Sequence, residues 1–169
     1  MHVQWTSAPG DILGNNTATV QWGVSPRSLQ NQVFGYQFNF TDVQKNISRT
    51  YYLNAATMTG LTPGAQYFYR VGDDLDGWSS VFNFVATRSA DMITPENPLR
   101  IAFFGDLGWY YAQSLSYIQT EAAQGVYDHV THVGDYAYDL QDQNGNVGDQ
   151  FQDSIEPITS STPYMGCEG

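Results

Sequence analysis

The chain has 169 residues, a length that suits one domain of ordinary size or two small ones. Seventeen acidic and six basic residues give a net charge of -11, which excludes the basic stripe that a nucleic-acid surface requires. No apolar run approaches the roughly 18 residues of a membrane span, and the mean hydropathy is -0.37. Neither nucleic acid nor a membrane is therefore an expected partner.

The first half of the chain, residues 3–87, has the pattern of an all-β domain. Short runs rich in Val, Tyr, Phe and Thr recur there between Gly, Pro and Asn residues, as is typical of strands and turns. Four such runs are Thr17–Gly23, Gly35–Phe40, Tyr67–Val71 and Val81–Ala86. Their spacing predicts a small antiparallel β-sandwich, and we expect its aromatic residues to form the core rather than a ligand cage.

The segment Leu61–Tyr67 precedes the third of these runs and combines a Pro-Gly turn with a tyrosine. It resembles the tyrosine corner of fibronectin type III domains, in which the tyrosine hydroxyl bonds to nearby backbone and joins two strands. The resemblance implies a fibronectin III-like β-sandwich over residues 1–90.

A polar, proline-containing segment at residues 91–98 indicates a linker, and the hydrophobic period changes after it. Leu99–Phe104 is an apolar run that predicts a buried strand, and Val130–Val133 predicts the next one. Between them a helix, expected to end at Gly125, is predicted by four residues at helical spacing: Tyr111, Leu115, Ile118 and Ala122. The three elements make a strand–helix–strand unit, the building block of a parallel sheet.

The remaining residues continue this α/β pattern. After a polar loop at 141–148, a second helix is predicted by Phe151, Ile155 and Ile158. We expect Pro157 to limit that helix, because proline removes a helical hydrogen bond. Pro163–Cys167 predicts a third strand.

Both predicted strands of the unit end in a Gly-Asp pair, Gly105-Asp106 and Gly134-Asp135, and Tyr138 follows the second aspartate by three residues. Because the carboxyl ends of parallel strands meet at one edge of a sheet, we expect both carboxylates at that edge. The two carboxylates would repel each other unless a divalent or trivalent cation relieved the repulsion. The pattern therefore predicts a metal site. The alternative is that both aspartates only cap loops at the strand ends.

The three histidines of the chain are not expected to be metal ligands. His132 and His129 belong to the apolar strand and are predicted to be buried there, and His2 is near the terminus and predicted to be solvated. The metal site would therefore consist of oxygen ligands within this chain.

The chain resembles the amino-terminal part of a plant-like purple acid phosphatase over nearly its whole length. Besides the fibronectin-like part and the two aspartate motifs, the resemblance is carried by Pro98–Ile101, Ile155–Ile158, Pro163–Met165 and Cys167–Gly169. The last of these is similar to the start of that family's Gly-Asn-His-Glu/Asp motif. The resemblance implies that residues 99–169 are the amino-terminal part of a truncated α/β metallophosphoesterase domain.

The resemblance also implies roles for three residues. Asp106 would bind a ferric ion, Asp135 would bridge it to a second, divalent ion (Zn, Mn or Fe), and Tyr138 would bind the ferric ion as a coloured phenolate. The implied reaction is hydrolysis of phosphate monoesters at acid pH by a hydroxide held by the metal pair. No other catalytic residue is expected in this chain, because the family's remaining Asn and His ligands would follow Gly169. The chain by itself is therefore expected to be inactive.

Two alternatives remain open for the function. One is a non-catalytic β-sandwich binding module followed by a vestigial phosphatase segment. The other is a phosphodiesterase or nucleotidase with the same fold, although Tyr138 favours the monoesterase.

Three Asn-X-Ser/Thr patterns, at Asn15, Asn39 and Asn46, are typical of N-glycosylated proteins. We therefore expect a glycoprotein that is secreted, extracellular or vacuolar-lysosomal. No leader follows Met1, which fits an internal residue of a longer precursor. Cys167 is the single cysteine, so no internal disulfide can form, and the resemblance allows a homodimer.

Overall fold

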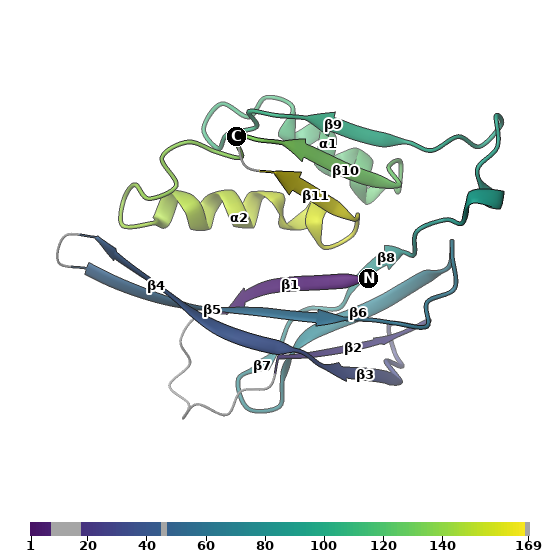
Figure 1. Cartoon of the computed structure of the whole chain (residues 1–169), viewed down its shortest axis with the longest axis horizontal. Coiled ribbons are helices and arrows are strands. Elements are labelled where there is room, and N and C mark those ends of the chain that lie inside the picture. The colour runs from purple at the N-terminus through teal and green to yellow at the C-terminus, as the bar shows by residue number, and fades with distance from the viewer. Residues whose placement is uncertain (8–17, 45–46, 168–169) are drawn as a thin grey trace. The chain divides into compact units, whose positions relative to one another are not determined.

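The computed structural model describes residues 1–7, 18–44 and 47–167. Within these residues the protein is mostly β-sheet with two α-helices, and the chain divides into two compact units, Met1–Ala86 (unit 1) and Thr87–Gly169 (unit 2) (Figure 1). The strands of unit 1 are β1 (His2–Ser7), β2 (Thr19–Gly23), β3 (Asn31–Phe34), β4 (Tyr36–Gln44), β5 (Ile47–Thr57), β6 (Gln66–Asp73), β7 (Gly77–Trp78) and β8 (Phe82–Val85). The elements of unit 2 are the 3-10 helix η1 (Ala90–Met92), β9 (Ile101–Phe104), α1 (Leu115–Ala123), β10 (His129–Val133), α2 (Asn146–Thr159) and β11 (Tyr164–Cys167).

Unit 1 consists of two antiparallel sheets that share one hydrophobic core. In the first sheet β5 pairs with β1 on one side and β4 on the other. In the second, the order is β3-β2-β6-β7, and β8 also pairs with β6. Core residues come from both sheets and from the positions just after β5 and β8: Val20, Trp22, Ala56, Met58, Tyr67, Tyr69, Val71, Phe84 and Ala86.

The pattern of β6 explains how this core forms. Burial alternates along Gln66–Asp73, so Tyr67, Tyr69 and Val71 all lie on the inner face. The register pairs Val71 with Val20 and Tyr69 with Trp22 of β2, which places large apolar side chains next to one another on that face.

The tyrosine that ends the Leu61–Tyr67 segment has the hydrogen bond expected from the sequence. The Tyr67 hydroxyl accepts a hydrogen bond of 3.0 Å from the backbone N–H of Thr62, five residues earlier. The predicted bond from this tyrosine to nearby backbone is confirmed, and it ties the turn to the start of β6.

The prediction that the aromatic residues of Gly35–Phe40 lie in the core is wrong. Three of them, more than half exposed, point outward from β4: Tyr36, Phe38 and Phe40. The register explains this, because Trp5 packs against the core and pairs with Asn54, which pairs with Gln37. The core side of the sheet therefore receives Gln37, whose amide donates to Asn54 Oδ1 at 2.7 Å, and its aromatic neighbours face the other way.

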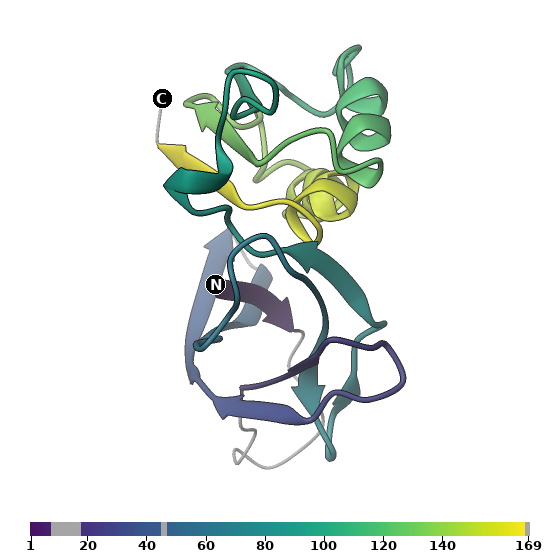
Figure 2. The same ribbon diagram turned by 90° about the vertical axis from the view of Figure 1, so that its right-hand side faces the viewer.

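Unit 2 is built on a parallel sheet of order β11-β10-β9, as the strand–helix–strand pattern predicts. Both helices pack on the same face of this sheet (Figure 2). Ile118 of α1 and Phe151 and Ile158 of α2 form one cluster with Ala102 and Val130 of the strands. The opposite face is apolar and exposed, with Ile101, Phe103, Val133 and Met165 between 40% and 70% accessible.

Three details of the helices differ from the sequence predictions. Tyr111 is 91% exposed and precedes α1, which begins at Leu115, because the chain beyond β9 first makes a series of turns. The predicted polar loop ends early, since α2 begins at Asn146. That helix also passes through Pro157, because the bond from Ser160 N–H to Glu156 C=O, 2.9 Å, keeps its last turn closed.

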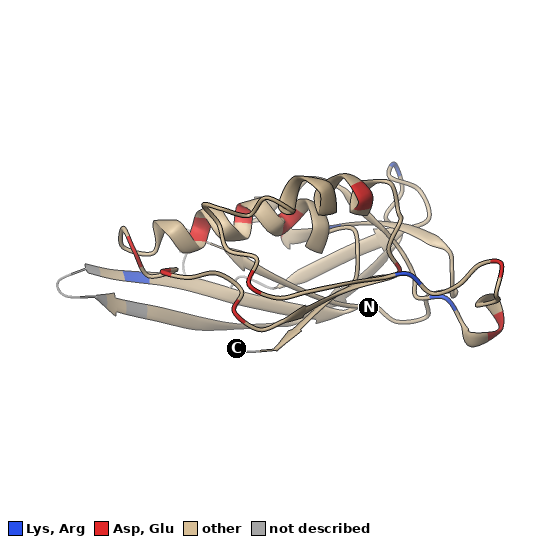
Figure 3. Ribbon diagram, turned by 90° about the horizontal axis from the view of Figure 1, so that it is seen from above, with Lys and Arg blue, Asp and Glu red and all other residues tan. Residues whose placement is uncertain are grey.

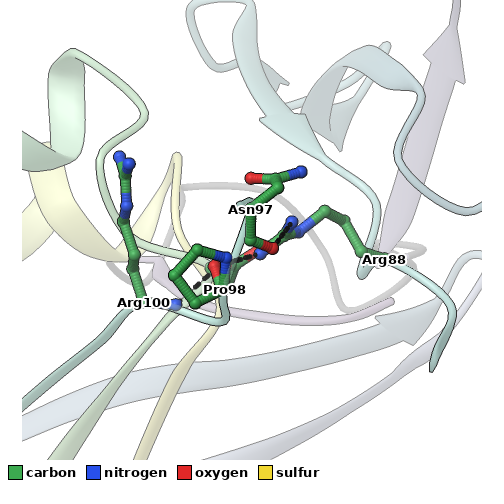
Figure 4. A network of polar contacts seen from close by, with 5 residues as sticks. Arg88, Asn97, Pro98 and Arg100 are labelled. Atoms are coloured by element: carbon green, nitrogen blue, oxygen red, sulfur yellow. Dashed lines mark hydrogen bonds and ion pairs between the residues drawn. The ribbon is translucent and has the colours of Figure 1, made fainter. Parts of the chain in front are cut away.

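A network of hydrogen bonds centred on Arg88 holds in place the segment that leads into β9, the first strand of unit 2 (Figure 4). The Arg88 guanidinium donates to both carboxylate oxygens of Asp128, at 2.6 and 2.8 Å, and to the carbonyls of Asn97 and Pro98. Asp128 Oδ2 also accepts the backbone N–H of Arg100 at 2.8 Å. Burial alone would raise the pKa of Asp128, but these hydrogen bonds bring the pKa below its ordinary value.

Acidic residues are distributed unevenly between the two units (Figure 3). Residues 1–86 contain five acidic and four basic residues, whereas residues 87–169 contain 12 acidic residues and only Arg88 and Arg100 as basic ones. Among the residues that the structure describes, no helix has the length and apolar character needed to cross a membrane. Of the glycosylation patterns, Asn39 lies exposed on β4, while Asn15 and Asn46 fall outside the described residues.

Candidate metal centre

Asp106 and Asp135 each lie one glycine beyond the end of a strand, β9 and β10 respectively, within the turn that follows, and both have a left-handed backbone. Their φ angles are 51° and 44°. This conformation costs an L-residue roughly 1–2 kcal/mol, although aspartate tolerates it better than most. Non-glycine residues in such conformations concentrate at functional sites, where the surrounding structure holds them in place.

Backbone hydrogen bonds tie the two turns together. The N–H of Asp106 donates to the carbonyl of Gly134 at 3.4 Å, and the N–H of Gly108 donates to the carbonyl of Tyr136 at 3.1 Å. A side chain at Gly105 would place its Cβ 3.0 Å from the carbonyl oxygen of Val133. Glycine at that position therefore allows the close approach of the two strand ends.

The side chains of Asp106, Asp135 and Tyr138 converge. The Tyr138 hydroxyl donates to Asp106 Oδ1 and lies 3.0 Å from Asp135 Oδ2. These hydrogen bonds, that to Asp106 first, raise the pKa of Tyr138 because they favour the protonated phenol. The sequence placed the two aspartates at one edge of the sheet, and the structure brings all three predicted ligands to one point.

The chemistry of these donors fits a hard metal ion. Two carboxylates and a phenol offer oxygen atoms, which suit trivalent iron and the harder divalent cations. The three oxygens already face one another, as donors around a shared cation do. Within the described part of the chain, no group of three or more His, Cys, Asp or Glu residues is placed to hold a metal. The two aspartates therefore need the phenol of Tyr138 as their third donor.

The histidines lie apart from this oxygen cluster. His132 is fully buried, as predicted, whereas the prediction for His129 is wrong, because that side chain is only half-buried on the outer face of β10. His2 is exposed and shares a 3.0 Å hydrogen bond with the Thr57 hydroxyl. Cys167 is exposed at the end of β11.

Contacts of His132 lie beneath the oxygen cluster and were not predicted from the sequence. His132 Nδ1 is 2.6 Å from the Tyr164 hydroxyl, and the His132 ring contacts the ring of Tyr136. Burial lowers the pKa of His132, while the Asp135 backbone and the Asp106 carboxylate oppose that shift. A polar ring inside an apolar strand was the available signal, but its hydrogen-bond partner, Tyr164, comes from a different strand and could not be inferred from spacing.

Comparison with known proteins identifies the family. The family model described as "Purple acid Phosphatase, N-terminal domain" matches residues 1–86, just over half of the chain. The whole chain aligns with the human protein acid phosphatase type 7, at 36% identity over 176 residues. An Arabidopsis thaliana protein named probable inactive purple acid phosphatase 9 is 33% identical over 132 residues, which cover 68% of this chain. The chain belongs to the purple acid phosphatase family.

The fold agrees with this assignment. The structure of the yellow lupin purple acid phosphatase PPD1 aligns with 99% of this chain at a TM-score of 0.67 and 22% sequence identity. At that identity the likeness concerns the fold alone. The chain spans 39% of the human relative, 19% of the Arabidopsis relative and 33% of the lupin chain.

Proposed function

We propose that the full-length protein hydrolyses phosphate monoesters at acid pH with a pair of metal ions, and that this chain supplies part of the ligand set. The observation that carries the proposal is the convergence of the Tyr138 hydroxyl with the carboxylates of Asp106 and Asp135 at the ends of two adjacent parallel strands. Membership of the purple acid phosphatase family supports it.

Each of the three residues has a distinct part in this proposal. Asp106 and Tyr138 would hold a ferric ion, and Asp135 would be shared with a second ion, Zn, Mn or Fe. When bound, such a metal pair activates water and stabilises the charge that develops on a phosphoryl group. The left-handed backbone at the two aspartates and the bonds between their turns hold the carboxylates in place beforehand.

The proposal also covers the architecture around the site. Unit 1 would be a fibronectin III-like β-sandwich over residues 1–90, joined by a linker at 91–98. Residues 99–169 would be the amino-terminal part of a metallophosphoesterase domain. The tyrosine bond of Tyr67, the shared core of the two sheets and the parallel β9–β11 sheet support this interpretation.

Phosphatase activity of the full-length protein tests the function directly. We expect Asp135→Asn to lower kcat/KM for an aryl phosphate by more than about 100-fold, the upper range for residues that only orient a metal's ligands. Asp153→Asn, on the exposed surface of α2, is the matched control that should keep its activity. Full activity in Asp135→Asn would contradict the proposal.

A spectroscopic test isolates Tyr138. In the iron-loaded full-length protein, Tyr138→Phe removes the phenolate and should abolish the visible absorption band. Tyr110→Phe, a nearby exposed tyrosine that we place outside the ligand set, should leave the band intact. A spectrum unchanged by Tyr138→Phe would remove this residue from the ligand set.

The non-catalytic binding module remains the main rival, and the word "inactive" in the name of the Arabidopsis relative gives it weight. The two functions predict different metal contents. A phosphatase would hold a pair of metal ions, whereas a vestigial segment would have no need to bind any. We also propose that the protein is secreted, that it is N-glycosylated at Asn15, Asn39 and Asn46, and that it forms a homodimer. The mass of the native protein before and after deglycosylation checks the glycans and the dimer.

A further inference from the structure

His132 is a buried polar residue that the chemistry proposed above does not use. Its side chain is 0% exposed, on the inner face of β10, three residues before Asp135. Nδ1 is bonded to Tyr164, whereas Nε2 is buried and makes no hydrogen bond of good geometry, although the Asp135 backbone lies close enough to the ring to act on its pKa. A phenylalanine of similar shape would fill this space without an unpartnered nitrogen, but it would leave the Tyr164 hydroxyl without its bond to the ring.

The ring of His132 connects all three strands of the sheet. It lies 4.9 Å from the ring of Phe104 at the end of β9, measured between centroids, and 4.3 Å from that of Tyr136 in the turn after β10. Its hydrogen bond of 2.6 Å reaches Tyr164 of β11. The imidazole is therefore held in one orientation from three directions.

Tyr136 carries this connection to the aspartates. Its backbone carbonyl accepts the N–H of Gly108, and the carbonyl of Gly134 accepts the N–H of Asp106. The Tyr136 hydroxyl occupies the space over Gly166 that a Cβ at that position would take. The Tyr136 ring is thus confined between His132 and β11, and its backbone fixes the turn that carries Asp106.

We propose that His132 is a positioning residue, which through Tyr164 and Tyr136 holds the Asp106 and Asp135 turns in register. It does not touch the oxygen cluster, and its effect passes through ring contacts and two backbone hydrogen bonds. The inference that His132 serves a metal site rests on the function proposed above. Its effect on the two turns can be measured without any metal.

Hydrogen exchange of the metal-free protein tests the proposal. His132→Phe and Tyr164→Phe each remove the bond between the two side chains and keep both rings. We expect either variant to raise exchange at the Asp106 and Gly108 amides about tenfold, through local opening, without a loss of global stability. The double variant should exchange no faster than either single one, since both remove the same bond.

Two further variants complete the test. His129→Phe changes the other histidine of the same strand, on the opposite face, and should leave the Asp106 and Gly108 amides unchanged. Gly166→Ala displaces the Tyr136 hydroxyl and should reproduce the faster exchange while leaving the His132–Tyr164 bond in place. Unchanged exchange in His132→Phe, or an equal rise across β10 and α2, would show that His132 is only a core residue and overturn the proposal.

Terbium binding separates this inference from the metal site itself. Tyr-sensitised Tb³⁺ luminescence of the wild-type protein should depend on Asp106, Asp135 and Tyr138, and His132→Phe should weaken Tb³⁺ affinity by about 10-fold. If substitution of those three residues leaves Tb³⁺ binding intact, the proposed metal site fails, and the exchange experiment still decides the role of His132. Unweakened site-dependent Tb³⁺ binding in His132→Phe would overturn the positioning role.

Discussion

Unit 1 of this chain forms a core enclosed between two sheets, whereas the three predicted metal ligands all lie in unit 2. Unit 1 is nearly balanced in charge, and its two sheets bury their apolar side chains against each other. Unit 2 has 12 acidic against two basic residues, and helices cover only one face of its sheet. Unit 1 is therefore specified mainly by hydrophobic pattern, whereas unit 2 also contains converging like charges and left-handed aspartates that hydrophobic pattern does not explain.

The largest expected effect concerns the independence of the two cores. Met58→Ala in unit 1 and Ile158→Ala in unit 2 each remove a fully buried side chain and should lower the free energy of unfolding by about 3 kcal/mol. Each variant should shift only the urea transition of its own unit. Fluorescence with and without Trp109, the single tryptophan of unit 2, distinguishes the transitions. A shift of both transitions by one variant would show that the units unfold together.

A smaller, pH-dependent effect should belong to unit 2 alone. The folded pKa of Asp128 lies below its unfolded value, so its ion pair with Arg88 stabilises at neutral pH, and this contribution is lost as the pH falls through the folded pKa. We expect Asp128→Asn to lower the stability of unit 2 at pH 7 and to match the wild type in strong acid. Asp153→Asn provides the control, and a gap that does not close in acid would contradict this account.

The left-handed backbone at Asp135 should reverse the sign of the stability difference between a Gly and an Ala variant, compared with a position inside a helix. At Asp135, where φ is 44°, a Gly variant should be more stable than an Ala variant by about 1 kcal/mol. At Asp153, inside α2, the same pair should differ by about 1 kcal/mol in the opposite direction. Chemical denaturation of the four variants measures both differences. An Ala variant as stable as the Gly variant at position 135 would mean that this backbone carries no strain.

The smallest effect is expected in unit 1 from Tyr67→Phe. This change removes the hydrogen bond to the N–H of Thr62 but keeps the buried ring. Thr62 is exposed, so its N–H can bond to water instead, and the loss should be less than that caused by Met58→Ala. Thermal unfolding of both variants gives the comparison. A loss as large as that of the core variant would mean that this bond, not the core, dominates the stability of unit 1.

Much of the architecture could be predicted because it depends on local pattern. The apolar runs before Asp106 and Asp135 and the helical spacing of Leu115, Ile118 and Ala122 led directly to the parallel sheet and α1. The Gly-Asp pairs predicted where the carboxylates meet, since strand direction alone determines that edge.

The failures concern properties that local pattern does not contain. The outward direction of Phe38 depends on cross-strand register, which a strictly alternating sequence leaves undecided by one residue. Tyr111 is spaced from Leu115 as a helical residue would be, but it lies in a series of turns before α1. The hydrogen bond of His132 with Tyr164 joins residues 32 positions apart, so only the folded structure brings them together.

The outward aromatic residues of β4 have a practical consequence for handling the protein. In the described sheet β4 is an edge strand of nine residues, so its free backbone groups and exposed rings form a template for pairing with other chains. Concentrated preparations should self-associate through this edge, and a glycan at Asn39 would obstruct it. Phe38→Lys should raise solubility without altering the fold, a change that light scattering across a concentration series would reveal.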